Sequence, residues 1–269
     1  MPDPLVLLDR EAHVATLTFN DPERRNAMTE AMGVAFAERT ALLREEPDLR
    51  AVVPTGAGRA FSAGGDLDMI EARAKEGAER PVLARRAIRD TMRAFYQLFL
   101  SVRDLPCPTV AAVQGHAIGA GLCVALACDL RLVSREAKLG LNFTRLGLHP
   151  GMGATWTLPR LVGPALAAEL LYTGRILDGE EAARIGLANR ALAPDAVVEK
   201  ARTLATEIAA SAPLAVQGVK RALARSPGAS LEDQLSFEAH EQAGDFTSRD
   251  VHAGLAAARE RRDPEFEGI

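Results

Sequence analysis

The sequence predicts an α/β fold that continues into a wholly helical C-terminal region. Through the first half of the chain, short runs of β-branched and small apolar residues alternate with longer amphipathic stretches, which is the pattern of strands separated by helices. Beyond Gly151 the strand-like runs nearly vanish and helical patterns remain. We therefore expect a core of βαβ units over residues 1–195 and a helical region over residues 196–269.

Length and composition are those of a soluble globular protein. The 269 residues allow one domain or two, and 48% are hydrophobic and 25% charged. A net charge of −4 gives no reason to expect nucleic acid or a membrane as partner. The first eleven residues lack the long apolar core of a secretion signal, and the longest apolar run, 117–128, is too short to span a bilayer. Three cysteines in one apolar segment indicate reduced thiols in a cytoplasmic protein: Cys107, Cys123 and Cys128.

Local patterns predict the first elements. Residues 14–19 alternate as a half-buried strand. Thr29 is expected to cap a long amphipathic helix that ends near Glu46. Residues 51–55 read as a short strand, and Pro54 within it cannot donate to a ladder, so we expect it at a sheet edge or strand end.

The middle of the chain alternates between predicted helices and strands. A helix begins at Asp66, but residues 71–79 are so charged that we expect a loop there. A second helix over 83–104 is stopped by two prolines. The later helices are rich in alanine and poor in aromatics, so they need neighbours to bury their faces, which favours oligomerisation. Strands are predicted at 109–113, 129–133 and 138–141, and helices at 164–173, 179–185, 195–211, 213–225, 230–244 and 248–262.

Two glycine-rich turns point to a ligand with developing negative charge. The strand at 109–113 is followed by Gly115, Gly119 and Gly121 and then by a short apolar helix that stops at Asp129. Glycines at such a junction let backbone N–H groups approach a ligand, and a helix start adds unpaired N–H groups. A second turn, Phe61–Asp66, has the same small-residue character. Two such turns can each aim one N–H at a single oxygen, which makes an oxyanion hole.

The chain resembles the crotonase (enoyl-CoA hydratase/isomerase) superfamily over roughly residues 5–263. The matching stretches occur in the family's order and spacing, at 20–28, 58–66, 108–129, 146–155, 161–163, 171–175 and 182–187. The resemblance implies a spiral of ββα units, although no clear internal repeat is visible in the sequence. It also implies that the helical C-terminal region packs the chain into a homotrimer or a dimer of trimers.

The same resemblance implies an activity in fatty acid metabolism, as a lyase or isomerase. The substrate would be a coenzyme A thioester, with no bound cofactor and no metal, and its enolate would be held by the N–H groups of Gly65 and Ala120. Arg24 and Arg25 occupy the loop that grips coenzyme A in the family, where cations suit a phosphate. The remaining positions implied to contact coenzyme A or substrate are Ala27, Ala63, Gly65, Asp66, Leu67, Ala120 and Arg261.

The acid–base machinery departs from the family pattern. Hydratases of the family use two glutamates, and the matching positions here are Cys123 and Phe143. Phenylalanine cannot carry a proton, and a thiol in an apolar helix holds its proton tightly. A two-glutamate hydration mechanism is therefore not expected, and Cys123 is interpreted as a small core residue in preference to a catalytic one.

Three other side chains are candidates for proton transfer or binding. Tyr96 aligns with a histidine of a related dehalogenase, or it is simply an aromatic residue of an amphipathic helix. His149 borders the acyl pocket by resemblance, or it is a local hydrogen-bonding group. Asp68 shares a helix face with Glu71 near the first turn, or that face is merely solvated.

Three further hypotheses compete with an acyl-CoA enzyme. A non-catalytic acyl-CoA-binding protein would keep the oxyanion hole without the acids. A serine hydrolase is disfavoured because the residues around Ser62 do not form a G-x-S-x-G elbow. A dinucleotide-binding fold is disfavoured because the glycines at 115–121 have the wrong spacing.

Overall fold

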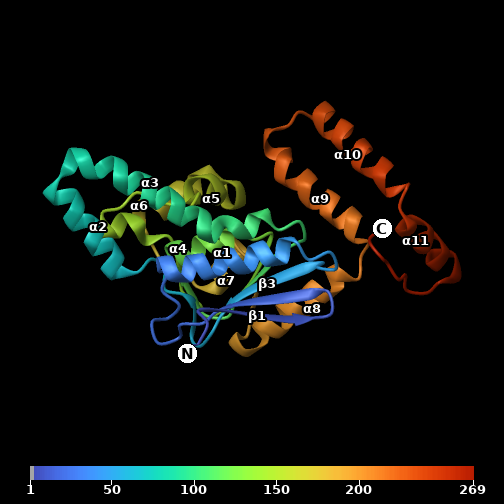
Figure 1. The fold of residues 1–269 in the computed structure, drawn as a ribbon, viewed down its shortest axis with the longest axis horizontal. Helices are drawn as coiled ribbons and strands as arrows, with labels where there is room; N and C mark the ends of the chain where they lie inside the picture. Colours follow the sequence, from blue (N-terminus) through green and yellow to red (C-terminus); the bar gives the residue numbers. More distant parts are fainter. Residues whose placement is uncertain (1–2) are drawn as a thin grey trace.

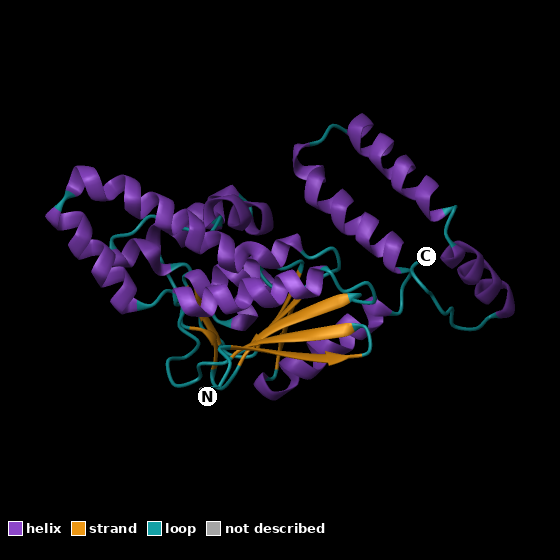
Figure 2. Cartoon of the chain, viewed as in Figure 1, coloured by secondary structure: helices purple, strands orange, loops and turns teal. Residues whose placement is uncertain are grey.

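The computed structural model describes residues 3–269 and has the α/β architecture expected from the sequence (Figure 1, Figure 2). The strands are β1 (Val6–Glu11), β2 (Val14–Phe19), β3 (Ala51–Gly56), β4 (Ala60–Ser62), β5 (Val110–Val113), β6 (His116–Ile118), β7 (Leu130–Ser134), β8 (Leu139–Gly140) and β9 (Arg190–Leu192). The helices are α1 (Glu30–Arg44), α2 (Leu67–Glu79), α3 (Pro81–Leu100), α4 (Ala120–Ala127), α5 (Ala154–Val162), α6 (Pro164–Thr173), α7 (Gly179–Arg184), α8 (Val197–Ala209), α9 (Pro213–Arg225), α10 (Leu231–Asp245) and α11 (Arg249–Glu260). Short 3₁₀ turns are η1 (Ser101–Asp104), η2 (Asn142–Leu146), η3 (Pro194–Ala196) and η4 (Ser226–Gly228).

The strands form three small sheets, ordered β1-β2-β3, β4-β6-β8 and β5-β7-β9. Among the strands of residues 3–269, only the β1–β2 hairpin is antiparallel, and the other strand pairs run parallel with helices in their connections. Because parallel strands end at a common edge, the turns that follow β4 and β6 are brought together there. This pairing places the two glycine-rich turns side by side.

Pro54 explains why β3 and β5 lie in different sheets although they are neighbours. Pro54 is in β3, at the edge of its sheet, as expected from the missing N–H. The Val52 N–H, two residues earlier, points toward β5 and donates to Pro108 O at 3.0 Å. Because backbone nitrogens along a strand point alternately to its two neighbours, the Pro54 nitrogen also faces β5. With no hydrogen there, the ladder stops after one bridge, and the Thr55 hydroxyl donates to Ala112 O at 2.9 Å instead.

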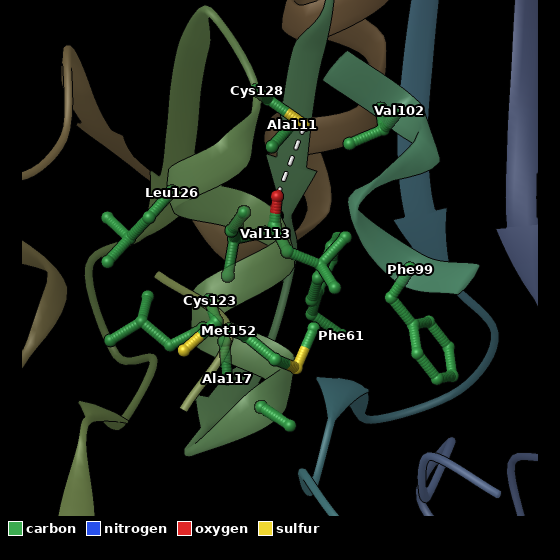
Figure 3. Close-up of a cluster of buried hydrophobic side chains, with 14 of the residues drawn as sticks. Phe61, Phe99, Val102, Ala111, Val113, Ala117, Cys123, Leu126, Cys128 and Met152 are labelled. Carbon is green, nitrogen blue, oxygen red and sulfur yellow. Dashed lines mark hydrogen bonds between the residues drawn. The ribbon is translucent and has the colours of Figure 1, made fainter. Parts of the chain in front are cut away.

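An aromatic cluster joins the strands to the first helices and fixes the core beneath the site. Phe19 of β2 stacks on Phe36 of α1 with ring centroids 5.1 Å apart, and it meets Phe61 of β4 edge-on at 5.6 Å. Phe99 of α3 packs edge-on against Phe95 at 5.2 Å. Figure 3 shows Phe61 and Phe99 beside the buried residues of β5, β6 and α4. The cluster therefore ties α1 and α3 to the strand that leads into the first turn.

We expect Phe99→Ala to lower the free energy of unfolding by about 3–5 kcal/mol, because it leaves a ring-sized cavity in the core. Phe99 has no exposed surface. Tyr172→Ala is the matched control, since Tyr172 is 79% exposed and its loss should change stability by less than about 0.5 kcal/mol. Chemical denaturation followed by circular dichroism measures both variants, and equal stabilities would contradict the assignment of Phe99 to the core.

The expected loop over residues 71–79 is wrong, because these residues complete helix α2. The Asp66 side chain caps the helix by accepting from the Met69 N–H at 2.9 Å, and Arg73 pairs with Glu76 at 3.1 Å one turn apart. The charges that suggested a loop are thus intrahelical ion pairs on an exposed face. Helix α2 also packs against α3, which the local sequence does not reveal.

Several other boundaries differ from the sequence expectation. The long helix 83–104 ends at Leu100 and tightens into the 3₁₀ turn η1. The sequence patterns do not predict four of the strands and one of the helices, namely β1, β4, β6, β9 and α5. Three of these strands have only three residues, too few to show a period, and α5 carries Pro159 inside it. By contrast, Thr29 caps α1 as predicted, accepting from the Met32 N–H at 3.1 Å.

The C-terminal helices divide into one that packs on the sheets and three that extend away from them. Helix α8 buries a stripe of small residues against β3, β5 and β7. Helices α9, α10 and α11 lie at one end of the molecule, with α9 against α10 (Figure 1). Lys220 of α9 anchors this group to the core through Asp129 at 2.9 Å and Cys107 O at 2.7 Å. The predicted division at residues 195 and 196 stays a prediction.

Candidate active site

Glycine is required where the two turns meet. A Cβ placed on Gly64 would lie 2.4 Å from Ile118 O and 3.5 Å from the Ala120 nitrogen, and Gly64 has a φ of +91°. Any side chain at this position would push the turn after β4 away from the start of α4. The sequence Gly64-Gly65 therefore sets how closely the two backbone segments approach each other.

The two turns present backbone N–H groups that the fold does not use. Met28 pairs with Gly65 by donating to Gly64 O at 2.8 Å and accepting from Asp66 N–H at 3.3 Å, so the Gly65 N–H points away from Met28. Ala120 is the first residue of α4, where an N–H has no acceptor in the helix. Among residues 3–269, neither N–H has a backbone acceptor, and both residues line the same cavity.

The cavity has a volume of about 910 Å³ and lies between α2, α3, the two turns and the segment after β8. Much of its wall is apolar, with side chains such as Ile70, Met92 and Phe95. Nearly all residues that the sequence singled out line it, namely Arg24, Arg25, Ala27, Ala63, Gly65, Asp66, Leu67, Asp68, Tyr96, Ala120, Phe143 and His149. Cys123 and Arg261 do not, and Arg261 is an exposed residue at the end of α11.

The arginine loop at the cavity mouth is held by a buried asparagine that the sequence reasoning did not single out. Asn26 has no exposed surface, and its amide donates to Ala57 O at 3.0 Å and to Ala60 O at 2.8 Å. Its side-chain oxygen accepts from the Asp21 N–H at 2.9 Å. These bonds fix the turn so that the neighbouring Arg25, with a φ of 54°, remains exposed at the mouth.

Charges gather at the mouth of the cavity rather than in its depth. Arg24 pairs with Asp66, the residue that also caps α2. Half of the Arg24 side chain remains exposed, so its guanidinium keeps room for a second anionic partner. Asp68 is exposed in the first turn of α2, where its charge complements the helix N-terminus.

Comparison with known proteins identifies the family. The family model for enoyl-CoA hydratase/isomerase matches residues 9–269. The chain belongs to the enoyl-CoA hydratase/isomerase family. It is 38% identical to the mitochondrial enoyl-CoA hydratase domain-containing protein 2 of Homo sapiens, over 95% of this chain and 86% of that one.

Solved structures place the fold in the same superfamily. The crystal structure of an enoyl-CoA hydratase from Bacillus anthracis matches with a TM-score of 0.89 at 33% identity, covering 98% of this chain and 100% of that one. An enoyl-CoA hydratase from Mycobacterium smegmatis matches with a TM-score of 0.87 at 32% identity, covering 98% and 99% of the two chains. The predicted crotonase-like α/β fold is thereby confirmed.

In this family member, position 123 lies outside the cavity. Cys123 is buried among apolar residues that include Met152 and Ala117 (Figure 3), and its thiol donates to Gly151 O over 3.7 Å. Burial raises the pKa of the Cys123 thiol to about 12. The thiol is therefore protonated at neutral pH and behaves as a core residue.

Phe143 does line the cavity, as an apolar wall rather than an acid. Its ring atom Cζ lies 3.9 Å from where a Cβ on Gly119 would be, directly beside the start of α4. The side chain is half-buried and packs against the main core. Phenylalanine thus makes the cavity wall beside Gly119 less polar than a carboxylate at position 143 would.

Tyr96 supplies a hydroxyl to the cavity wall. A Cβ on Gly151 would lie 2.5 Å from the Tyr96 oxygen, so the hydroxyl sits directly against that glycine backbone. Burial, and to a smaller extent the neighbouring Cys123, raises the pKa of the Tyr96 hydroxyl. Tyr96 is therefore a proton-bearing hydrogen-bond donor at neutral pH.

The tautomer of His149 follows from its backbone contact. The ring Nδ1 lies 2.7 Å from Pro150 O, and a carbonyl oxygen can only accept. A neutral His149 therefore carries its proton on Nδ1, which leaves the lone pair on Nε2. Since the residue lines the cavity and is exposed, Nε2 is available to a ligand as an acceptor or base.

Ser62 lies in the interior and is not among the residues that line the cavity. It is fully buried, and its hydroxyl donates to Asn26 O at 2.7 Å.

Over residues 3–269, no helix is long and apolar enough to cross a membrane. Within the same range, no group of three or more His, Cys, Asp or Glu residues gathers closely enough to hold a metal ion.

Proposed function

We propose that this family member acts on an acyl-CoA thioester through an enolate whose oxygen is held by the N–H groups of Gly65 and Ala120. The observation that carries the proposal is that two N–H groups from separate turns are unused by the fold and line one cavity. Preorganised donors of this kind stabilise charge as it develops, and they cost little reorganisation during the reaction. The helix start at Ala120 adds a positive dipole end to the same place.

The proton-transfer step falls to groups other than a glutamate pair. A thioester forms an enolate when a base removes a proton from the carbon next to the carbonyl, and an acid can return it elsewhere. Tyr96 offers a donor and His149 an acceptor at Nε2, both in the cavity wall. An apolar Phe143 beside the carbonyl site disfavours a bound, activated water. These features favour enolate chemistry such as isomerisation over two-glutamate hydration.

The alternative is a protein that binds acyl-CoA without turning it over. Both functions use the same cavity and the same N–H pair, so binding alone does not separate them. The deciding experiment incubates a panel of acyl-CoA thioesters with the protein in deuterated water. Enzymatic enolate formation exchanges the α-protons for deuterium, which mass spectrometry detects. Saturable binding without exchange or turnover would favour the non-catalytic alternative.

We propose that Arg24 and Arg25 bind the phosphates of coenzyme A, because both lie exposed at the cavity mouth on a rigid turn. The double variant Arg24→Ala/Arg25→Ala should bind acetyl-CoA about tenfold more weakly, since charge-assisted hydrogen bonds to phosphate are lost. Calorimetry with acetyl-CoA and with its 3′-dephospho form measures the effect, and the wild-type preference for the phosphorylated form should shrink. A matched control is Arg202→Ala, which lies away from this cavity. Unchanged affinity in the double variant would contradict the assignment.

We also propose a homotrimer, alone or stacked as a dimer of trimers. Large apolar side chains on the C-terminal helices remain exposed in one chain, including Leu223 at 67%, Leu231 at 75% and Phe246 at 66%. Sedimentation should give three or six times the 28.7 kDa of one chain. A stable monomer at micromolar concentration would contradict it. In such an assembly Arg261, exposed here, could reach a neighbouring cavity.

Two further proposals concern the cofactor and the cellular location. Enolate formation uses the thioester and groups of the chain alone, so we propose that no bound cofactor is needed. The buried, protonated cysteines suit a reducing compartment, and we propose a cytoplasmic location.

A further inference from the structure

We propose that Asn142 is a specificity-determining residue that binds an oxygen on the β-carbon of the acyl group, so that the cavity prefers 3-oxygenated acyl thioesters. This inference rests on the proposed function, because it places the thioester oxygen at the N–H pair. It is carried by the position of one carboxamide that the sequence did not single out.

The Asn142 side chain lies beside Gly119, the residue that precedes one of the two N–H donors. Its Oδ1 atom is 3.6 Å from where a Cβ on Gly119 would be, and Gly119 immediately precedes the donor Ala120. Asn142 also lines the cavity. In a 3-oxygenated acyl thioester, four covalent bonds separate the carbonyl oxygen from the β-oxygen. A group beside the hole for the first oxygen is therefore within reach of the second.

The carboxamide is free to bind a ligand. Over residues 3–269 no side chain or backbone group hydrogen-bonds to it, whereas the neighbouring Thr144 hydroxyl donates to Leu171 O at 3.0 Å. An amide offers both a donor and an acceptor, so it can pair with a hydroxyl or a carbonyl oxygen. Apolar side chains line the same cavity, among them Phe143, Ile118 and Met152. The carboxamide is thus a polar group in a wall that these apolar side chains share.

The backbone that carries Asn142 is fixed in place. Asn142 begins the turn η2, and the Arg145 guanidinium later in that turn donates to Thr173 O at 2.8 Å. On the other side, Gly174 packs so closely that a Cβ there would lie 3.2 Å from the Asn142 Cα. Anchoring of this kind lets one side chain select between ligands without moving the wall.

Selectivity follows from desolvation. A saturated acyl chain that enters the cavity removes water from the carboxamide without replacing its hydrogen bonds, which weakens binding. A β-hydroxyl or β-keto oxygen replaces them. The net difference expected for one neutral hydrogen bond is about three- to tenfold in affinity.

The test compares two ligands that differ by one oxygen. Calorimetry should show that the wild type binds 3-hydroxybutyryl-CoA, as one of its enantiomers, about three- to tenfold more tightly than butyryl-CoA. The near-isosteric variant Asn142→Leu should abolish this preference, and Asn142→Ala should do the same if the leucine is too bulky. Phe143→Leu is the matched control from the same wall, and it should change both affinities alike and keep the preference.

The outcomes separate this inference from the proposed function. If the wild type binds both ligands with equal affinity, or if both Asn142 variants keep the preference, the assignment of Asn142 is overturned while acyl-CoA binding stands. If the wild type binds neither ligand, the proposed function fails and the inference fails with it.

Discussion

Replacing Ala120 with proline is expected to slow α-proton exchange of a bound acyl-CoA by about 10²–10³-fold, the typical effect of losing one oxyanion donor. Ala120 is the first residue of α4, a position at which proline fits the helix geometry, and the substitution replaces the N–H with a ring methylene. The preceding Gly119 has no Cβ to clash with the proline ring. The variant should therefore fold, lose one specific hydrogen bond and place a methylene where the thioester oxygen would sit.

A second proline substitution controls for general effects of the imino acid. Glu30 is the first residue of α1, is exposed and does not line the cavity, so Glu30→Pro makes the same change outside the candidate site and outside the C-terminal helices. Exchange measured by mass spectrometry should be close to wild type in this control. Circular dichroism checks that both variants fold. A folded Ala120→Pro protein with the wild-type exchange rate would refute the proposed role of this N–H.

Introducing two carboxylates is expected to raise crotonyl-CoA hydration by at least about 10²-fold, because general acid and base groups typically contribute about 10²–10⁴-fold. The double variant is Cys123→Glu/Phe143→Glu. Phe143 already lines the cavity. The Cys123 thiol donates to Gly151 O, and the Tyr96 hydroxyl lies directly against Gly151, so a longer side chain at position 123 should reach the wall that Tyr96 forms. Loss of enoyl-thioester absorbance measures the rate.

The carboxylate experiment needs a control for side-chain size. The variant Cys123→Gln/Phe143→Gln has nearly the same shape and cannot transfer protons, so it should not gain activity. Burial next to a second carboxylate raises the pKa of a glutamate, and a shared proton would suit the acid role. Efficient hydration by the unmodified protein would contradict the acid–base assignment. A folded glutamate variant that binds crotonyl-CoA and gains nothing would contradict the position of the cavity.

Local patterns in the sequence were sufficient for the α/β class and for the two glycine-rich turns, whereas the family resemblance supplied most of the other residues found in the cavity wall. Strand-like runs followed by Gly64-Gly65 and by Gly119 identified both turns, because the conformational freedom of glycine is a property of the residue itself. Thr29 marked a helix start for the same reason, since an N-cap acts within one turn. Motif order then gave the family, which the comparisons confirmed.

The tertiary structure alone decided which of these groups face a ligand. Whether an N–H is unused depends on the parallel pairing of β4 with β6 and on the bridge between Met28 and Gly65, which join segments far apart in the chain. The same long-range packing removes Cys123 from the cavity, turns residues 71–79 into a helix against α3, and brings Asn142 beside Gly119. Periodicity reports only neighbours along the chain, whereas these outcomes depend on contacts that form when distant elements pack together.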